Sequence, residues 1–189
     1  MGRSGNPSRR PTPEQLDAAR GRAIPDLLAD RLRVVFVGIN PGLYSGAVGH
    51  HFARPGNRFW KALHGSGFTE REWSPFDDLD LVTVGIGITN LVDRTTASAA
   101  ELTADELRTG RDSLEAKIAR YRPRVVAILG ITAYRTGFGR PKAGFGPQDR
   151  ALAGSPVWVL PNPSGLNAHH QLDDLIRRFA ELRVASGMR

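Results

Sequence analysis

Apolar and polar positions occur in blocks along the chain, and four short apolar runs stand out. Valine, isoleucine and leucine dominate them, and glycine, proline or charged residues follow closely. Runs of this kind are typical of strands that are buried on both faces, as the strands of a parallel sheet are. The predicted strands lie within residues 34–42, 81–92, 125–130 and 157–160, and the first of these runs ends in a tight turn.

Helices are predicted between these runs by capping residues and by apolar positions at helical spacing. Thr12, Asn57 and Thr103 have the features of N-caps, Pro123 ends the helix after Thr103, and a short helix is expected near Thr132. The apolar positions of the last predicted helix are Leu172, Leu175, Ile176, Phe179 and Leu182. The alternation of strands and helices, without repeats, predicts a three-layer α/β/α sandwich around a central, mainly parallel four-stranded sheet.

The length of 189 residues suits one domain with a sizeable core and is too short for two of ordinary size. Residues 2–13 hold three arginines and no large apolar side chain, so we expect them to be disordered. Residues 1–22 are therefore predicted to form a basic, flexible tail with a short helix, and residues 23–189 a single domain. The basic, glycine-rich loop 137–146 is expected to be mobile.

The chain is strongly basic, with 26 lysines and arginines against 19 acidic residues, a net charge of +7 and a pI of about 10.7. Most of the cations are arginines, whose planar fork matches the oxygens of a phosphate group. This favours a nucleic acid or a nucleotide polyphosphate as the partner. A basic surface without a binding role is the alternative.

The absence of cysteine excludes disulfides, thiolate metal sites, iron–sulfur clusters and a cysteine nucleophile. His50 and His51 are adjacent, so their rings point in different directions, and we expect neither a metal nor a cofactor. No signal-peptide core and no membrane-spanning run is evident, which predicts a soluble, cytoplasmic protein. We expect it to be a monomer.

Polar side chains follow three of the predicted strands. Asn40 lies in the turn after the first strand, at the end of a sheet where ligands bind in open α/β folds, although asparagine is also an ordinary turn former. Asp93 follows the second strand, where it could act in catalysis or pair with Arg94. After the fourth strand comes a loop of small and rigid residues, 161–167, that contains one apolar side chain, Leu166.

The turn Gly38-Ile39-Asn40-Pro41-Gly42 and the segment Asn162-Pro163-Ser164-Gly165-Leu166-Asn167 together resemble the two signature motifs of the uracil-DNA glycosylase superfamily. More specifically, the chain resembles the mismatch-specific branch of that family, which includes the thymine-DNA glycosylases. The likeness extends through residues 52–60 and 88–94 and the last helix, and so covers nearly all of the chain from about Arg33 onward. The motifs are individually of moderate specificity, but their occurrence together in this order is strongly indicative.

The resemblance implies that the protein flips uracil out of duplex DNA, preferably from a G·U mismatch, and hydrolyses its glycosidic bond. A mismatched base costs less to extrude than a paired one. The family pattern gives Asn40 the role of holding the attacking water and Phe52 that of stacking on the base. Backbone groups near Ile39 and Gly42, together with Ser45, would bind the base.

The resemblance also implies that the second motif contacts DNA. Leu166 matches the residue that enters the gap left by the flipped base, and Gly165 and Asn167 would face the opposite guanine. Asn162 and Ser164 complete the predicted DNA-binding set. The family can carry a basic residue just after this loop, whereas this chain has Ala168, which weakens the expectation of strict selectivity for guanine.

Two further possibilities follow from the residues themselves. Asp93 could activate the water alongside Asn40 or in its place, because a carboxylate is a stronger base than an amide.

The function of the protein could also differ from excision. A protein that binds mismatched DNA without catalysis is one alternative. A nucleotide-binding α/β enzyme is another, although neither a Walker motif nor a G-x-G-x-x-G fingerprint is present.

Overall fold

The computed structural model describes residues 10–166 and 170–188, and it contains a five-stranded sheet in the order β2-β1-β3-β5-β4. Four strands are parallel, as predicted: β1 (Val34–Gly38), β2 (Ile86–Asn90), β3 (Val125–Leu129) and β5 (Val157–Leu160). The fifth, β4 (Gly146–Pro147), pairs antiparallel with β5 at the sheet edge. The predicted loop 137–146 therefore ends in a strand that the sequence pattern did not indicate.

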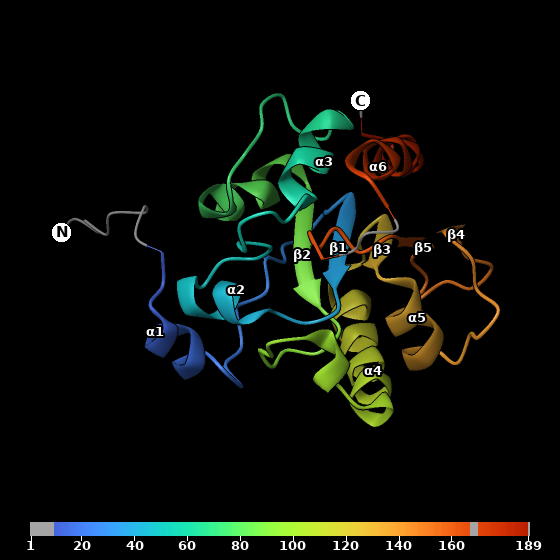
Figure 1. Ribbon diagram of the computed structural model, residues 1–189. Helices are drawn as coiled ribbons and strands as arrows, with labels where there is room; N and C mark the ends of the chain where they lie inside the picture. The colour runs from blue at the N-terminus through green and yellow to red at the C-terminus, as the bar shows by residue number, and fades with distance from the viewer. Residues whose placement is uncertain (1–9, 167–169, 189) are drawn as a thin grey trace.

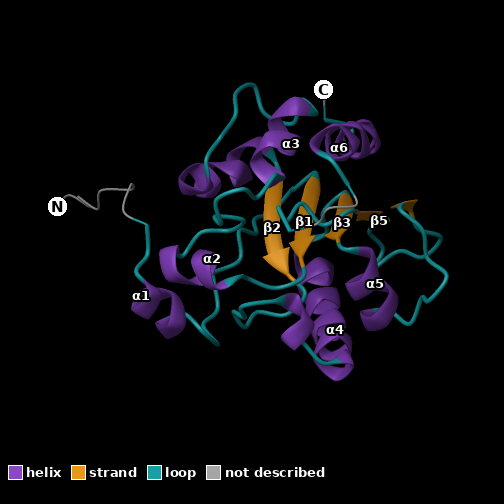
Figure 2. Cartoon of the chain, in the orientation of Figure 1, coloured by secondary structure: helices purple, strands orange, loops and turns teal. Residues whose placement is uncertain are grey.

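Helices cover both faces of the sheet, which confirms the three-layer architecture (Figure 1). One face is covered by α3 (Phe59–Gly65) and α6 (Leu172–Ser186), and the other by α4 (Ala104–Tyr121) and α5 (Ile131–Gly137). Figure 2 shows the strands between these two helical layers. The remaining elements are α1 (Pro13–Ala18), α2 (Leu43–Val48) and the 3-10 helices η1 (Pro75–Val84) and η2 (Ala99–Glu101).

The predicted helix starts are largely confirmed. Thr12 and Thr103 cap α1 and α4 with complete capping boxes. Asn57 accepts a hydrogen bond from the backbone N–H of Phe59 at 2.9 Å, although Arg58 stands between it and the first residue of α3. By contrast none of the predicted helix starts corresponds to α2, which follows Gly42 and has no side-chain cap.

The second strand begins later than the apolar run 81–92 suggests. Residues up to Val84 belong to η1, which Ser74 and Asp77 open with a capping box, and Gly85 ends it with a left-handed φ of 82°. Gly87 then lies inside β2, where a Cβ would come within 2.8 Å of the Leu27 carbonyl oxygen. The glycine therefore permits the close approach of a neighbouring backbone, as its position within a strand suggests.

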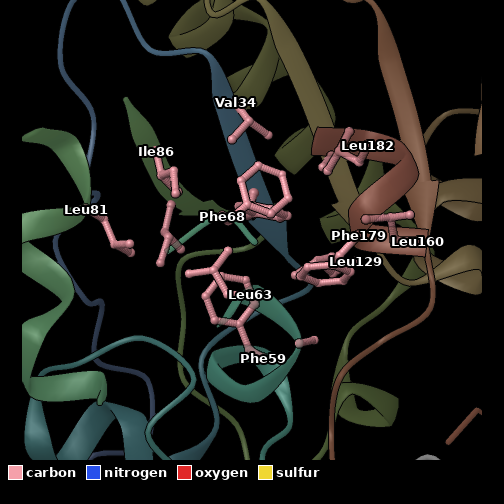
Figure 3. Packing of buried hydrophobic residues seen from close by; sticks show 14 of the residues in the cluster. Val34, Phe59, Leu63, Phe68, Leu81, Ile86, Leu129, Leu160, Phe179 and Leu182 are labelled. Carbon is pink, nitrogen blue, oxygen red and sulfur yellow. The ribbon is translucent and has the colours of Figure 1, made fainter. Parts of the chain in front are cut away.

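The larger of the two cores lies between the sheet, α3 and α6. Figure 3 shows side chains from β1, η1, α3 and α6 converging there, among them Val34, Leu81, Phe59 and Phe179. The ring of Phe36 at the centre is stacked on Phe179, with their centroids 5.3 Å apart. Among the described residues, no helix is long and apolar enough to cross a membrane.

Truncating Phe179 should destabilise the fold strongly. Its side chain is fully buried, so Phe179→Ala removes apolar burial and leaves a cavity, at a cost of about 3–5 kcal/mol of unfolding free energy. Val184→Ala on the same helix is the matched control, because Val184 is 74 % exposed and its truncation should change that free energy by less than about 0.5 kcal/mol. Urea unfolding measures both, and equal losses would contradict this view of the core.

Candidate functional site

A pocket of about 500 Å³ lies at the carboxyl ends of the parallel strands. Asn40 follows β1, Asn90 ends β2, Gly130 follows β3 and Asn162 follows β5, and all four residues line it. The strand order reverses at β1, because β2 lies on one side of it and β3 on the other. Loops diverge at such a point and leave a crevice in which ligands bind in open α/β sheets.

Most of the site residues predicted from the sequence meet in this pocket. Its lining includes Ile39, Asn40, Gly42, Ser45, Phe52, Asn162, Ser164 and Leu166. Gly165 lies beside it in the same loop, and Asn167 is outside the described residues. Segments more than 120 residues apart in the chain are therefore joined in one site, since the carboxyl ends of parallel strands share one edge of the sheet.

The side-chain amide of Asn40 is held in one orientation. Its Nδ2 donates to the carbonyl oxygen of Arg94 at 3.0 Å, to that of Pro41 at 3.2 Å, and to the hydroxyl of Thr96 at 2.7 Å. A carbonyl oxygen only accepts hydrogen bonds, so the nitrogen and not the oxygen of the amide must face this side. Within the described residues no group donates to Oδ1, which leaves it as a fixed acceptor for a water molecule.

Phe52 has a strained backbone and a supported ring. Its φ of 53° lies in the left-handed region, which a bulky residue rarely adopts and which costs on the order of 1–3 kcal/mol. The ring is stacked on Phe59, with centroids 4.2 Å apart and planes inclined by 22°. Ser45 accepts a hydrogen bond from the backbone N–H of Ala53 at 3.0 Å and so helps to hold this segment. An aromatic face is thus maintained in the pocket at a conformational cost.

Gly38 makes room for two side chains at the base of the pocket. A Cβ there would lie 2.5 Å from Oδ1 of Asn90 and 3.4 Å from the ring of Phe52. Any larger residue would displace one or both of them. The glycine at the end of β1 is therefore required by packing.

Asn90 and His51 are two pocket residues that the sequence reasoning did not select. Both are buried, and Nδ2 of Asn90 lies 3.4 Å from Nδ1 of His51, a long hydrogen bond. Nε2 of His51 lies 3.0 Å from the carbonyl oxygen of Pro25, which can only accept, so Nε2 carries the proton and Nδ1 is the acceptor. The signal for Asn90 was its place at a strand end, the same one that identified Asn40.

Burial lowers the pKa of His51 below its ordinary value of 6.5, although the Pro25 carbonyl and the carboxylates of Asp78 and Asp26 act in the opposite direction. The unfolded chain therefore binds a proton at this residue below about pH 6.5, whereas the folded protein resists it. Because the unfolded state then holds more protons, stability falls as the pH is lowered through this range. The neutral ring is the form that accepts from Asn90.

We expect His51→Gln to reduce the loss of stability in mild acid. Below pH 6.5 the wild-type free energy of unfolding should fall by up to about 1.4 kcal/mol per pH unit through this group alone, and the variant should lack that contribution. Urea unfolding between about pH 5 and pH 8 measures the difference. Identical pH slopes for the two proteins would show that His51 is not buried in its neutral form.

Asp93 does not lie in the pocket. Its side chain is 56 % exposed, and its carboxylate is 3.3 Å from Nζ of Lys117 on α4, which also binds Asp26 at 2.8 Å. The alternative to catalysis, an ion pair between Asp93 and Arg94, is wrong, because Arg94 binds both carboxylate oxygens of Glu106 instead. The structure thus does not bring Asp93 together with Asn40, and comparing Asp93→Ala with Asn40→Ala tests the catalytic role that the sequence suggested for it.

The pair of Arg94 and Glu106 supports the site indirectly. The hydrogen bond from Arg94, followed by the backbone N–H of Thr103, lowers the pKa of Glu106 to about 2. Arg94 thus joins α4 to the pocket, because its side chain pairs with Glu106 and its carbonyl oxygen accepts from Asn40. Within the described residues no group of three histidines or acidic residues could hold a metal ion, and His50 pairs with Asp78.

The loop of residues 162–166, here called the Leu166 loop, forms one rim of the pocket. Oδ1 of Asn162 accepts from the backbone N–H of Ser164 at 2.9 Å, and the hydroxyl of Ser164 accepts from the N–H of Leu166 at 3.3 Å. Leu166 is 73 % exposed. Two polar side chains thus shape a turn that presents an apolar one to solvent, beside an opening lined by Arg54.

Comparisons with known proteins agree with this architecture. The family model of the uracil DNA glycosylase superfamily matches residues 25–183. The fold is also similar to a solution NMR structure of a protein from Methanosarcina acetivorans that is proposed to be a uracil DNA glycosylase, with a TM-score of 0.60 and 18 % identity. The alignment covers 87 % of this chain and 98 % of that one. At that identity the likeness concerns the fold.

Proposed function

The chain belongs to the uracil DNA glycosylase superfamily, and from that premise we propose that it removes uracil from duplex DNA, preferentially from G·U mismatches. As a DNA glycosylase it acts on a base that lies inside the double helix, where no side chain can reach the glycosidic bond. The nucleotide must therefore be flipped into a pocket, at a cost of a few kcal/mol that is lowest for a mismatched base. This is the physical basis of the proposed preference.

The observation that carries the proposal is the fixed amide of Asn40 in the same pocket as Phe52. In our proposal the flipped uracil stacks on the free face of Phe52, while Oδ1 of Asn40 accepts a hydrogen bond from a water molecule and directs its oxygen to C1′ of the sugar. Asn90 is buried and hydrogen-bonded to His51, and in this proposal it presents a second side-chain amide to the edge of the base. In this proposal Phe52 stacks on the base, Asn40 positions the water, and Asn90 contacts the edge of the base.

The reaction is a hydrolysis. The bond from C1′ to N1 of uracil breaks, and its electron pair leaves with the uracil. The water oxygen bonds to C1′ and loses one proton to solvent, and the uracil anion takes up one proton from solvent to become neutral uracil. Positive charge develops on the sugar and negative charge on the base, so fixed donors around the uracil oxygens stabilise the transition state. An amide is a poor general base, so we expect slow turnover that relies on positioning.

The surface around the pocket suits a DNA partner. Arg54 lines the opening of the pocket. Arg140 and Lys142 line a second, neighbouring pocket, and Phe145 lines both pockets. Binding to phosphates through such cations should weaken as the salt concentration rises, because counterions are released from the DNA. Duplex affinity measured against salt concentration is the check on this part of the proposal.

The proposed substrate preference is tested by comparing duplexes that differ in one pair. Under single-turnover conditions, excision should be fastest for G·U and slower for A·U, because extruding a paired uracil costs more. A G·T duplex and single-stranded uracil complete the panel. Equal rates for G·U and A·U would contradict the preference for mismatches without contradicting excision itself.

A further inference from the structure

Arg58 binds the backbone on both sides of Leu166. Its guanidinium donates to the carbonyl oxygen of Ser164 at 2.7 Å, to that of Pro163 at 3.4 Å and to that of His170. The backbone N–H of Arg58 also donates to the Pro163 carbonyl at 3.0 Å. One partly buried side chain thus binds three carbonyl oxygens. Two of them belong to the Leu166 loop, and the third belongs to His170.

The Leu166 loop also rests directly on the segment that precedes Arg58. A Cβ at Gly165 would lie 2.5 Å from the carbonyl oxygen of Gly56, so the two backbones touch with no space for a side chain. Gly56 itself has a left-handed φ of 85°. The contact therefore depends on both Gly165 and Gly56, and it fixes the position of the Leu166 loop relative to residues 56–58.

The same short segment carries the aromatic wall of the pocket. Phe52 stacks on Phe59, and the side chain of Asn57 accepts from the backbone N–H of Phe59. Residues 52–59 therefore connect the surface on which the flipped base would stack with the residue that holds the Leu166 loop. The short, well-packed segment 52–59 therefore sets the distance between the base pocket and the Leu166 loop.

We propose that Arg58 is a positioning residue for base extrusion, which fixes Leu166 relative to the base pocket before DNA binds. This inference rests on the proposed function. A loop that is already ordered loses little conformational entropy when Leu166 enters the duplex, so more of the binding energy is left to hold the base outside the helix. Arg58 contacts neither the base nor the water, and its loss should impair extrusion and not bond cleavage.

Replacing Arg58 by lysine separates the hydrogen-bonding role of the guanidinium from its positive charge. A lysine keeps the positive charge, but its single ammonium group cannot reach three carbonyl oxygens that lie along a planar fork. Arg58→Lys should therefore behave like Arg58→Gln if the residue clamps the loop, and like the wild type if it only supplies charge to a phosphate. Arg111→Lys on the outer surface of α4, where Arg111 pairs with Asp112 and Glu115, is the matched control.

Hydrogen exchange of the free protein tests the clamp without any reference to DNA. In Arg58→Lys the amides of Ser164 and Leu166 should exchange about tenfold faster than in the wild type, since several hydrogen bonds to the loop are lost. Exchange in β1 and β3 should be unchanged, which shows that the variant is folded. Unchanged exchange in the loop would overturn the clamp, whatever the protein does to uracil.

Extrusion is then measured in an Asn40→Ala background, with 2-aminopurine beside the uracil of a G·U duplex. Binding of the Asn40→Ala protein should raise the fluorescence of 2-aminopurine, because the uracil beside it leaves the base stack. Adding Arg58→Lys should lower the population of extruded uracil about tenfold. Adding Arg111→Lys should leave that population unchanged. A full signal in the Arg58 variant would overturn the inference. Failure of the otherwise wild-type protein to release uracil would instead reject the proposed function, and the exchange experiment would still report on the clamp.

Discussion

Replacing Asn40 by alanine should lower the single-turnover rate of uracil excision by about 10²–10³-fold, the loss typical of removing one oriented group that acts on the transition state. The amide touches the pocket through Oδ1 only, because its Nδ2 is engaged with two carbonyl oxygens and a hydroxyl. Affinity for the G·U duplex should change little, since the residue offers no charge to phosphate. Measuring the rate and the dissociation constant separately distinguishes these effects.

Asp93→Ala is the matched comparison for Asn40→Ala. The carboxylate of Asp93 is bound to Lys117 outside the pocket, so we expect excision at nearly the wild-type rate. If Asp93→Ala instead removes activity and Asn40→Ala does not, the water is activated by the carboxylate and the assignment to Asn40 is wrong. Strong losses in both variants would indicate that the two residues act together in the DNA complex.

Leu166→Ala should lower excision from duplex DNA by about tenfold to a hundredfold, while having little effect on uracil in a single strand. The cost of holding a base outside the helix is a few kcal/mol, and a factor of ten in a population corresponds to about 1.4 kcal/mol. Leu166 is highly exposed and makes little contribution to the core, so the variant should fold normally. Equal losses on both substrates would contradict the role in extrusion.

Much of the architecture could be predicted from the chain. The four parallel strands, the three layers and the meeting of residues 38–42 with the Leu166 loop all follow from apolar runs that end in turns, since such ends gather at one edge of a parallel sheet. The caps at Thr12 and Thr103 were visible because a capping box is a local pattern of four residues.

The errors arose where local patterns are ambiguous. The run 81–92 is mostly apolar, but Gly85 can end a 3-10 turn as readily as it can interrupt a strand, and the strand starts only at Ile86. β4 is two residues long and is stabilised by its pairing with β5, which no periodicity reveals. Short elements of this kind are set by tertiary contacts more than by their own composition.

Side-chain partners were the least predictable part of the site. Asp93 and Arg94 are neighbours in sequence, yet each pairs with a different residue of α4, because the turn after β2 directs them toward that helix. The contact of His51 with Asn90 depends on burial and on the Pro25 carbonyl, neither of which the sequence displays. The role of Arg58 depends likewise on a loop more than 100 residues away.

The most direct test of the account is to incubate the wild-type protein with an end-labelled G·U duplex and to measure both free uracil and alkali-labile sites. We predict equal amounts of the two products, with no strand scission before alkali, and a rate reduced by about two to three orders of magnitude in Asn40→Ala. Binding of the duplex without release of uracil would contradict the account, and would mark the protein as one that recognises mismatched DNA without cleaving the glycosidic bond.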